Sequence, residues 1–183
     1  MRSLHRVSPN VATNIKQQVV FVRHGQSASN HLKMFTGWAD VDLTNRGTYE
    51  AKVAGQILRR EGYDFDIAYS SLLQRAIKTY FHMSQELDNC LFIPHVKHWR
   101  LNERHYGALE GLKKVETVEK FGKEQVKMWR RSFDVAPPKL AFNDPRHPKF
   151  DRKYHNIPSH DIPTAESLEC TIQRVLPYWY GTI

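Results

Sequence analysis

The chain has 183 residues, which suits a single domain with a sizeable buried core. Its 40% hydrophobic and 25% charged residues are ordinary for a globular protein, and no uncharged apolar run approaches the length of a membrane span, so an integral membrane protein is excluded. The net charge of +8 favours anionic partners, and without a run of interleaved basic and aromatic residues we expect small phosphorylated molecules rather than nucleic acid or a membrane.

Residues 1–18 are expected to form a basic N-terminal extension ahead of the first strand, and the segment Met1–Ala39 contains no Asp or Glu. It lacks the hydrophobic core of a secretory signal. Two interpretations stay open, a flexible extension and an organelle transit peptide. The two cysteines fit a reducing compartment, so a cytoplasmic location is expected, with organelle targeting as the alternative.

The apolar run Val19–Val22 is predicted to be a buried strand, and Arg23 and His24 follow it directly. Open α/β sheets bind ligands at the carboxyl ends of their strands. An imidazole there can accept a group covalently, and the neighbouring guanidinium matches phosphate oxygens. The junction therefore indicates phosphoryl transfer through a phosphohistidine. The three residues Arg-His-Gly alone are also compatible with a chance Arg-His pair at a strand end.

Strand and helix patterns alternate over the next eighty residues. Thr44 introduces a helical pattern that ends before Gly62, and Phe65–Tyr69 is predicted to be a second strand. Ser70 and Ser71 are candidate caps for the next helix, and a third strand is expected within residues 93–101. This order predicts an α/β fold with a mainly parallel sheet and helices on both faces.

The C-terminal part begins with a mostly helical segment, Lys113–Phe133, interrupted near Gly122. Asp134–Pro163 holds six of the nine prolines without a sustained period, and it is predicted to be a surface excursion that could cover the site. A final amphipathic helix begins near Glu166. It is expected to bury Leu168, Ile172, Val175 and Leu176 and to kink or end at Pro177.

Further polar groups follow the second and third strands. Arg75 lies one turn into a helix, where it could help to hold an anion, and Glu103 could serve as general acid and base. Arg130 and Arg131 could hold a second anionic group. Each group also has an ordinary interpretation as a solvated or ion-paired surface residue. Their convergence at strand ends favours the functional interpretation.

These residues sit in longer segments that resemble the cofactor-dependent phosphoglycerate mutases of the histidine phosphatase superfamily. The segments are RHGQSASN (Arg23–Asn30), FTGWADVDLT (Phe35–Thr44), LNERHYGALEGL (Leu101–Leu112), EQVKMWRRSF (Glu124–Phe133) and AESL (Ala165–Leu168). The resemblance runs almost continuously from residue 19 to residue 183. It implies one α/β domain over residues 19–183, a three-layer sandwich with a mainly parallel central sheet.

The resemblance also implies a function, the interconversion of 3-phosphoglycerate and 2-phosphoglycerate in glycolysis. 2,3-Bisphosphoglycerate would phosphorylate His24, Glu103 would give and take the proton, Arg23 and Arg75 would complete the catalytic set, and no metal would be needed. A homodimer or homotetramer is the implied assembly. The implied substrate-binding residues are Arg23, His24, Gly25, Gln26, Ser27, Ala28, Ser29, Asn30, Thr36, Gly37, Arg75, Glu103, Arg104, His105, Tyr106, Lys114, Arg130 and Arg131.

Three departures from the family pattern bear on activity. Gln26 stands where the family usually has Glu, and Ser29 where it has an aromatic residue. The family also continues to a strand and an AHGNS motif beyond the last residue of this sequence, so we expect a C-terminally truncated domain. Either this sequence is a portion of a longer protein, or the protein is a truncated relative. In this form we expect an exposed apolar edge beside residues 19–22 and impaired folding and catalysis.

Other functions stay open as alternatives. They are a catalytically impaired phosphate-binding relative, a bisphosphoglycerate mutase or phosphatase, a plain phosphatase and, on charge alone, a nucleic-acid binder. Ser27, Thr36 and Gly37 stand as they do in the mutases, which favours the mutase over the bisphosphoglycerate branch.

Overall fold

The computed structural model describes residues 18–88 and 90–183, and the expected N-terminal extension lies almost entirely outside this range. Two short strands, β1 (Ala68–Ser70) and β2 (His95–Lys97), pair in parallel, with Ala68 opposite His95. The second and third predicted strands and their parallel pairing are thus confirmed, each shorter than the predicted run. None of the described helices is long and apolar enough to cross a membrane.

The first predicted strand, Val19–Val22, runs as an extended segment that belongs to no sheet, so this prediction is wrong for the described residues. A strand needs a neighbouring backbone to bond to, and the sheet in the described part of the chain consists of β1 and β2 alone. Val20 packs against the core beside Leu58, while Phe21 is 80% exposed and stacks on Trp179 at 5.7 Å. Val19 is 59% exposed and Val22 is 42% exposed.

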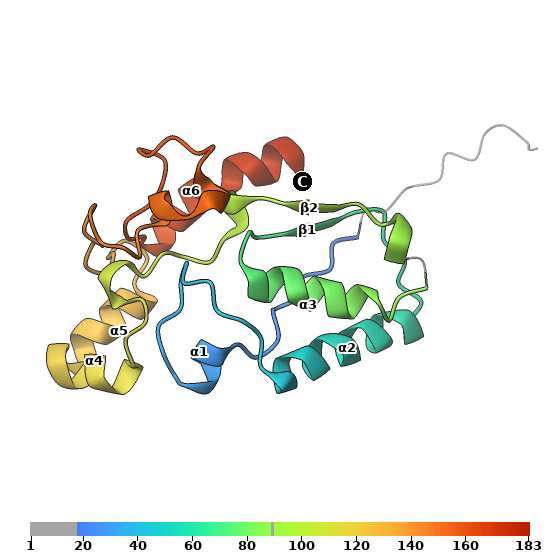
Figure 1. Ribbon diagram of the computed structural model, residues 1–183, viewed down its shortest axis with the longest axis horizontal. Coiled ribbons are helices and arrows are strands. Elements are labelled where there is room, and N and C mark those ends of the chain that lie inside the picture. The colour runs from blue at the N-terminus through green and yellow to red at the C-terminus, as the bar shows by residue number, and fades with distance from the viewer. Residues whose placement is uncertain (1–17, 89) are drawn as a thin grey trace, which may run out of the picture.

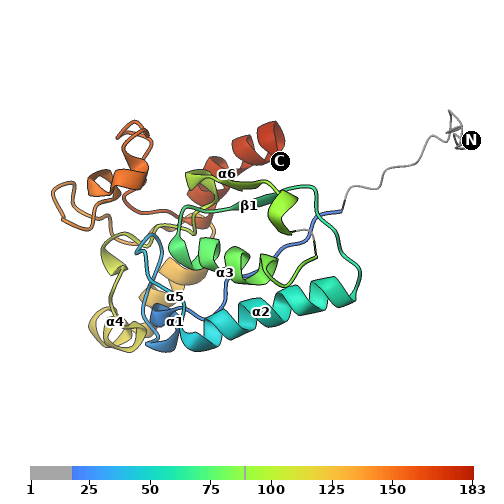
Figure 2. The same ribbon diagram turned by 45° about the vertical axis from the view of Figure 1, so that its right-hand side comes forward.

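Helices cover both faces of the two strands (Figures 1 and 2), which confirms the layered α/β arrangement. On one face lie α2 (Asn45–Arg60) and α3 (Gln74–Ser84), and on the other lies α6 (Leu168–Thr182). Gly55 lets α2 approach α3 closely, because a Cβ there would lie 2.2 Å from the carbonyl oxygen of Met83.

Thr44 caps α2 as predicted, by accepting a hydrogen bond from the Gly47 amide. The predicted serine caps of α3 are wrong. The helix begins at Gln74, and its amide donates to the Asp40 carboxylate at 2.7 Å. A cap supplied by a distant loop leaves no local sequence signal.

A second group of elements lies beside this layer (Figure 1). The short helix α1 (Ala28–His31) precedes the loop to α2, and α4 (Lys114–Phe121) and α5 (Lys123–Arg131) are separated by Gly122, whose φ of 82° ends α4 as predicted. Phe35, Leu109, Val126 and Trp129 form their core. Short 3₁₀ turns lie at η1 (Cys90–Phe92), η2 (Trp99–Leu101), η3 (Gly107–Leu109), η4 (Pro148–Phe150) and η5 (Arg152–Tyr154).

The proline-rich excursion contains only η4 and η5, as its composition predicts. It is anchored by Tyr154, which is 2% exposed, packs on Trp38 and accepts a hydrogen bond from Asn102 at 2.9 Å. The excursion helps to line a cavity of about 600 Å³ that contacts Trp38 and Glu110 but not His24, Arg75 or Glu103.

Helix α6 departs from its predicted pattern in two ways. It does not end at Pro177 but continues to Thr182. Proline lacks the amide hydrogen that would bond to the Gln173 carbonyl group, and both residues are on the exposed face of the helix. Its buried residues are Arg174 and Tyr178, whereas Leu168 is 44% exposed and Leu176 is 38% exposed.

Candidate active site

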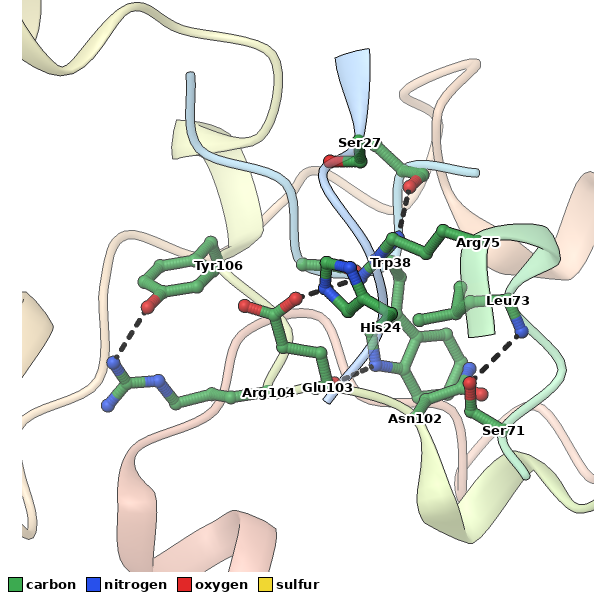
Figure 3. Close-up of polar contacts among 12 residues, drawn as sticks. His24, Ser27, Trp38, Ser71, Leu73, Arg75, Asn102, Glu103, Arg104 and Tyr106 are labelled. Carbon is green, nitrogen blue, oxygen red and sulfur yellow. Dashed lines mark hydrogen bonds and ion pairs between the residues drawn. The ribbon is translucent and has the colours of Figure 1, made fainter. Parts of the chain in front are cut away.

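His24 lies half-buried at the end of the extended segment (Figure 3), and its Nδ1 atom is 2.8 Å from the carbonyl oxygen of Gly25. A carbonyl oxygen only accepts, so Nδ1 carries the proton and Nε2 keeps its lone pair. Burial, followed by the positive charges of Arg75 and Arg23, holds the pKa of His24 below its usual value, against the Gly25 hydrogen bond and Glu103. The ring is therefore neutral near neutral pH, with the Nε2 lone pair free.

Arg75 is the buried cation of the site, with 1% of its side chain exposed. Its guanidinium donates to the carbonyl oxygens of Ala39 at 3.1 Å and Gly37 at 2.8 Å, and to Glu103 Oε2 at 2.8 Å. Figure 3 shows His24 beside this Arg75–Glu103 pair. The Glu103 side chain is 41% exposed, so one end of the pair is fixed and the other faces solvent.

The backbone next to His24 is held by contacts that the sequence analysis did not identify. The Gly25 amide donates to Thr79 Oγ1 at 3.1 Å, and the Gln26 amide donates to Glu50 Oε2 at 2.8 Å. A Cβ on Gly47 would lie 2.1 Å from the Gln26 carbonyl oxygen, so the loop rests directly on the start of α2. A glycine inside a helical pattern is the one available signal for such a close approach.

Residues of the predicted phosphate loop bond within the loop or to the segment that precedes α2. Ser27 and Asn30 form a reciprocal cap at the start of α1, with bonds of 3.3 and 3.1 Å. The Gln26 side chain accepts from Thr44 Oγ1 at 2.9 Å, the Ala28 amide donates to the Asp42 carbonyl oxygen, and Ser29 is 5% exposed. These side chains shape the loop.

Thr36 and Gly37 belong to the segment whose backbone contacts Arg75. Thr36 is 6% exposed, and Gly37 has a φ of 55°, which suits a residue without a side chain. A Cβ on Gly37 would lie 2.0 Å from Glu110 Oε1. The Gly37 carbonyl oxygen is thereby presented to Arg75.

A cationic rim, defined as Arg23, Arg104, Lys114 and Arg130, surrounds the pair. The Arg104 guanidinium donates to the Tyr106 hydroxyl at 3.1 Å and to the Arg130 carbonyl oxygen at 3.0 Å. Burial, followed by the charge of Arg130, lowers the pKa of Lys114, with Glu103 acting in the opposite direction and Arg23 in the same one. The charges of Arg130, Glu103 and Arg23 thus all act on Lys114, whereas Arg131 is exposed on the last turn of α5.

His105 is placed behind the site, since its side chain is 0% exposed. Its Nδ1 atom accepts from the Gly107 amide at 2.9 Å and lies 3.2 Å from Glu110 Oε1. Burial lowers the pKa of His105 to about 3 and raises that of Glu110 to about 7. Glu110 in turn accepts from the amides of Trp38 at 2.8 Å and Tyr106 at 3.0 Å, so it joins the two loops that carry Gly37 and Glu103.

No group of three or more His, Cys, Asp or Glu side chains with the geometry of a metal site occurs within residues 18–88 and 90–183. The charge available to an anionic ligand comes instead from guanidinium and ammonium groups. Such groups, aimed at a transferring phosphoryl group, stabilise the charge that develops on its oxygens.

Known proteins share this fold. A glucosyl-3-phosphoglycerate phosphatase from mycobacteria is 20% identical with a TM-score of 0.63, and the match covers 86% of this chain and 59% of that one. A protein of Escherichia coli assigned as an α-ribazole-5′-P phosphatase is 20% identical with a TM-score of 0.59, over 87% of this chain and 64% of that one. The chain thus spans about three fifths of the length of these structures.

A model of the histidine phosphatase superfamily (branch 1) matches residues 19–147, which include His24, Arg75 and Glu103. This match covers well over half of the chain. The chain belongs to the histidine phosphatase superfamily, branch 1.

Proposed function

We propose that this protein transfers a phosphoryl group through His24. The observation that carries the proposal is the neutral imidazole with a free Nε2 atom beside the Arg75–Glu103 pair. In the first step Nε2 bonds to phosphorus, the bond from phosphorus to the ester oxygen breaks, and the carboxyl of Glu103 gives its proton to that oxygen. In the second step a hydroxyl attacks the phosphohistidine, and the Glu103 carboxylate takes its proton.

The specific reaction that we propose is the interconversion of 3-phosphoglycerate and 2-phosphoglycerate, with 2,3-bisphosphoglycerate phosphorylating His24. The cationic rim supports this choice, because a phosphoglycerate carries a carboxylate besides its phosphate. Arg104, Lys114 and Arg130 offer the charge for that second anion. The motifs LNERHYGALEGL and WRR also favour the mutase reaction, because they resemble those of the phosphoglycerate mutases.

Hydrolysis is the second candidate, and it has an observation of its own. The Glu103 side chain is 41% exposed, so water can reach the carboxylate that would activate it. The similar structures described as phosphatases agree with this candidate in name.

A partition experiment separates the two candidates. The protein is incubated with 3-phosphoglycerate and a small amount of 2,3-bisphosphoglycerate, and both 2-phosphoglycerate and inorganic phosphate are measured. Mutase function predicts more 2-phosphoglycerate than phosphate, and hydrolase function predicts the reverse. The variant His24→Asn is the control, and persistence of either product in that variant would contradict transfer through His24.

A further inference from the structure

Helix α6 contributes a buried ion pair to the region behind the site. Arg174 is 7% exposed and Glu166 is 2% exposed. The guanidinium donates to both carboxylate oxygens, from Nε at 2.6 Å and from Nη2 at 2.9 Å. A two-point pair of this kind fixes both the distance and the plane of the guanidinium. The pair is therefore a rigid support, built from two residues that the predicted apolar face of α6 did not include.

The remaining donors of Arg174 reach the segment that carries Glu103. Nη1 donates to the carbonyl oxygen of Arg100 at 2.7 Å, and Nη2 donates to those of Asn102 at 3.1 Å and Glu103 at 3.3 Å. On the other side of Glu103, the His105 amide donates to Glu166 Oε2 at 2.9 Å. The pair thus holds the backbone before, at and after Glu103.

This support matters because the segment has little secondary structure of its own. Beyond the single turn η2, residues 102–106 belong to no helix or strand, so their carbonyl oxygens have no ladder partners. Trp38 Nε1 adds one more donor, 2.8 Å from the Glu103 carbonyl oxygen. The Glu103 side chain bonds to Arg75 but is 41% exposed, so its position also depends on the backbone that bears it.

We infer that Arg174 and Glu166 are positioning residues, which hold the Glu103 carboxyl where it can exchange a proton with the group on His24. The inference rests on the proposed function, in which Glu103 protonates the leaving oxygen. Its physical basis is that proton transfer requires hydrogen-bond reach, and a displacement of about 1 Å is enough to lower a rate on the order of 100-fold. The side-chain hydrogen bonds of Arg174 go to Glu166 and to carbonyl oxygens within residues 99–103.

The test compares two substrates that differ in their need for an acid. The p-nitrophenolate leaving group departs without a proton, whereas the alkoxide of an alkyl phosphate such as 3-phosphoglycerate requires one. The variant Arg174→Lys keeps a positive charge for Glu166 but loses the fork that reaches the carbonyl oxygens. We expect its kcat/KM for the alkyl phosphate to fall about 10- to 100-fold more than that for p-nitrophenyl phosphate. An equal loss for both substrates would show a merely structural role and overturn the inference.

The variant Glu103→Gln separates this inference from the proposed function. If Glu103 is the acid, Glu103→Gln alone produces the same selective loss, and adding Arg174→Lys to it produces no further selective loss. If Glu103→Gln is not selective, the proposed function fails. If it is selective but Arg174→Lys is not, only the positioning role fails.

Two further variants complete the design. Arg100→Met is the matched control, since Arg100 donates to the Arg174 carbonyl oxygen at 3.1 Å at the same junction without contacting Glu103 or Glu166 through its side chain. It should leave the substrate ratio unchanged. If Arg174→Lys does not fold, Glu166→Gln tests the same substrate ratio. This variant weakens the bonds between residue 166 and Arg174, while its amide oxygen can still accept from the His105 amide. A ratio unchanged in Glu166→Gln would then overturn the inference.

Discussion

The two sides of the site are built differently. On the transfer side, short hydrogen bonds tie His24 and Arg75 to buried backbone carbonyl groups and tie Glu103 to Arg75. On the rim, Arg23 is exposed and Lys114 and Arg130 are half-exposed, so these side chains keep rotational freedom. We propose that the fixed side performs the transfer and that the rim selects the molecule that undergoes it. Substitutions on the two sides should therefore change different kinetic constants.

The largest effect is expected on the transfer side, at the nucleophile. His24→Asn removes the lone pair that receives the phosphoryl group, so activity with every substrate should fall by a factor on the order of 10⁴ or more. The rates with 3-phosphoglycerate and p-nitrophenyl phosphate are measured in the same preparation. A variant that loses one activity and keeps the other would break the division between the two sides.

Arg75→Met should come next. The substitution removes a preorganised cation from the transferring group and should lower kcat by about 10²- to 10³-fold, again for both substrates. Lys78→Met is the matched control on the same helix, because the half-exposed Lys78 side chain pairs with Asp42 and not with Glu103. Circular dichroism and urea unfolding establish whether each variant is folded. A change confined to KM would place Arg75 with the rim residues instead.

Rim substitutions should have smaller and more selective effects. Lys114→Met or Arg130→Met removes a positive charge that would bind the carboxylate of 3-phosphoglycerate. The KM for 3-phosphoglycerate should therefore rise about 10-fold, while kcat and KM for p-nitrophenyl phosphate stay within a factor of two. Lys127→Met, an exposed change on α5, should alter neither. An equal loss with both substrates would mean that the rim participates in the transfer itself.

The smallest effect is expected at the buried His105–Glu110 contact, and it concerns the pH dependence of the free energy of unfolding. Between pH 4.5 and 6.5 the unfolded chain has a protonated His105 and an ionised Glu110, whereas the folded protein, with pKa values of about 3 and about 7, has a neutral His105 and a protonated Glu110. The two differences in bound protons cancel. In Glu110→Gln only the histidine difference remains, and the unfolded state then binds the extra proton.

The free energy of unfolding of Glu110→Gln should consequently rise with pH across this window, by about 1.4 kcal/mol per pH unit relative to the parent protein. Urea unfolding at pH 4.5, 5.5 and 6.5 measures the difference. Identical pH dependence in the two proteins would contradict the assigned protonation states.

The sequence predicted best what depends on neighbouring residues. The alternation of patterns predicted the parallel pairing of β1 and β2, and the break at Gly122 followed from its local conformation. The strand-end rule brought Arg75 and Glu103 into consideration, and the structure places them in contact. In each case the signal lies within a few residues of the feature.

Features that depend on distant partners could not be predicted in the same way. Val19–Val22 has strand-like residues, but hydrogen bonding in a sheet also requires a neighbour. The periodicity of α6 indicated a leucine face, whereas the helix buries Arg174 because the carbonyl oxygens of residues 100–103 need donors. The Asp40 cap of α3 and the Gly25–Thr79 contact are likewise produced by folding.

The central claim is that His24 Nε2 carries the phosphoryl group, and identification of the phosphorylated atom tests it most directly. The protein is treated with 2,3-bisphosphoglycerate, quenched under alkaline conditions and examined by ³¹P NMR and by mass spectrometry of its peptides. We predict an acid-labile phosphate on the Nε2 atom of His24, absent from His24→Asn. Phosphate on Nδ1, on another residue or nowhere in the protein would contradict the account.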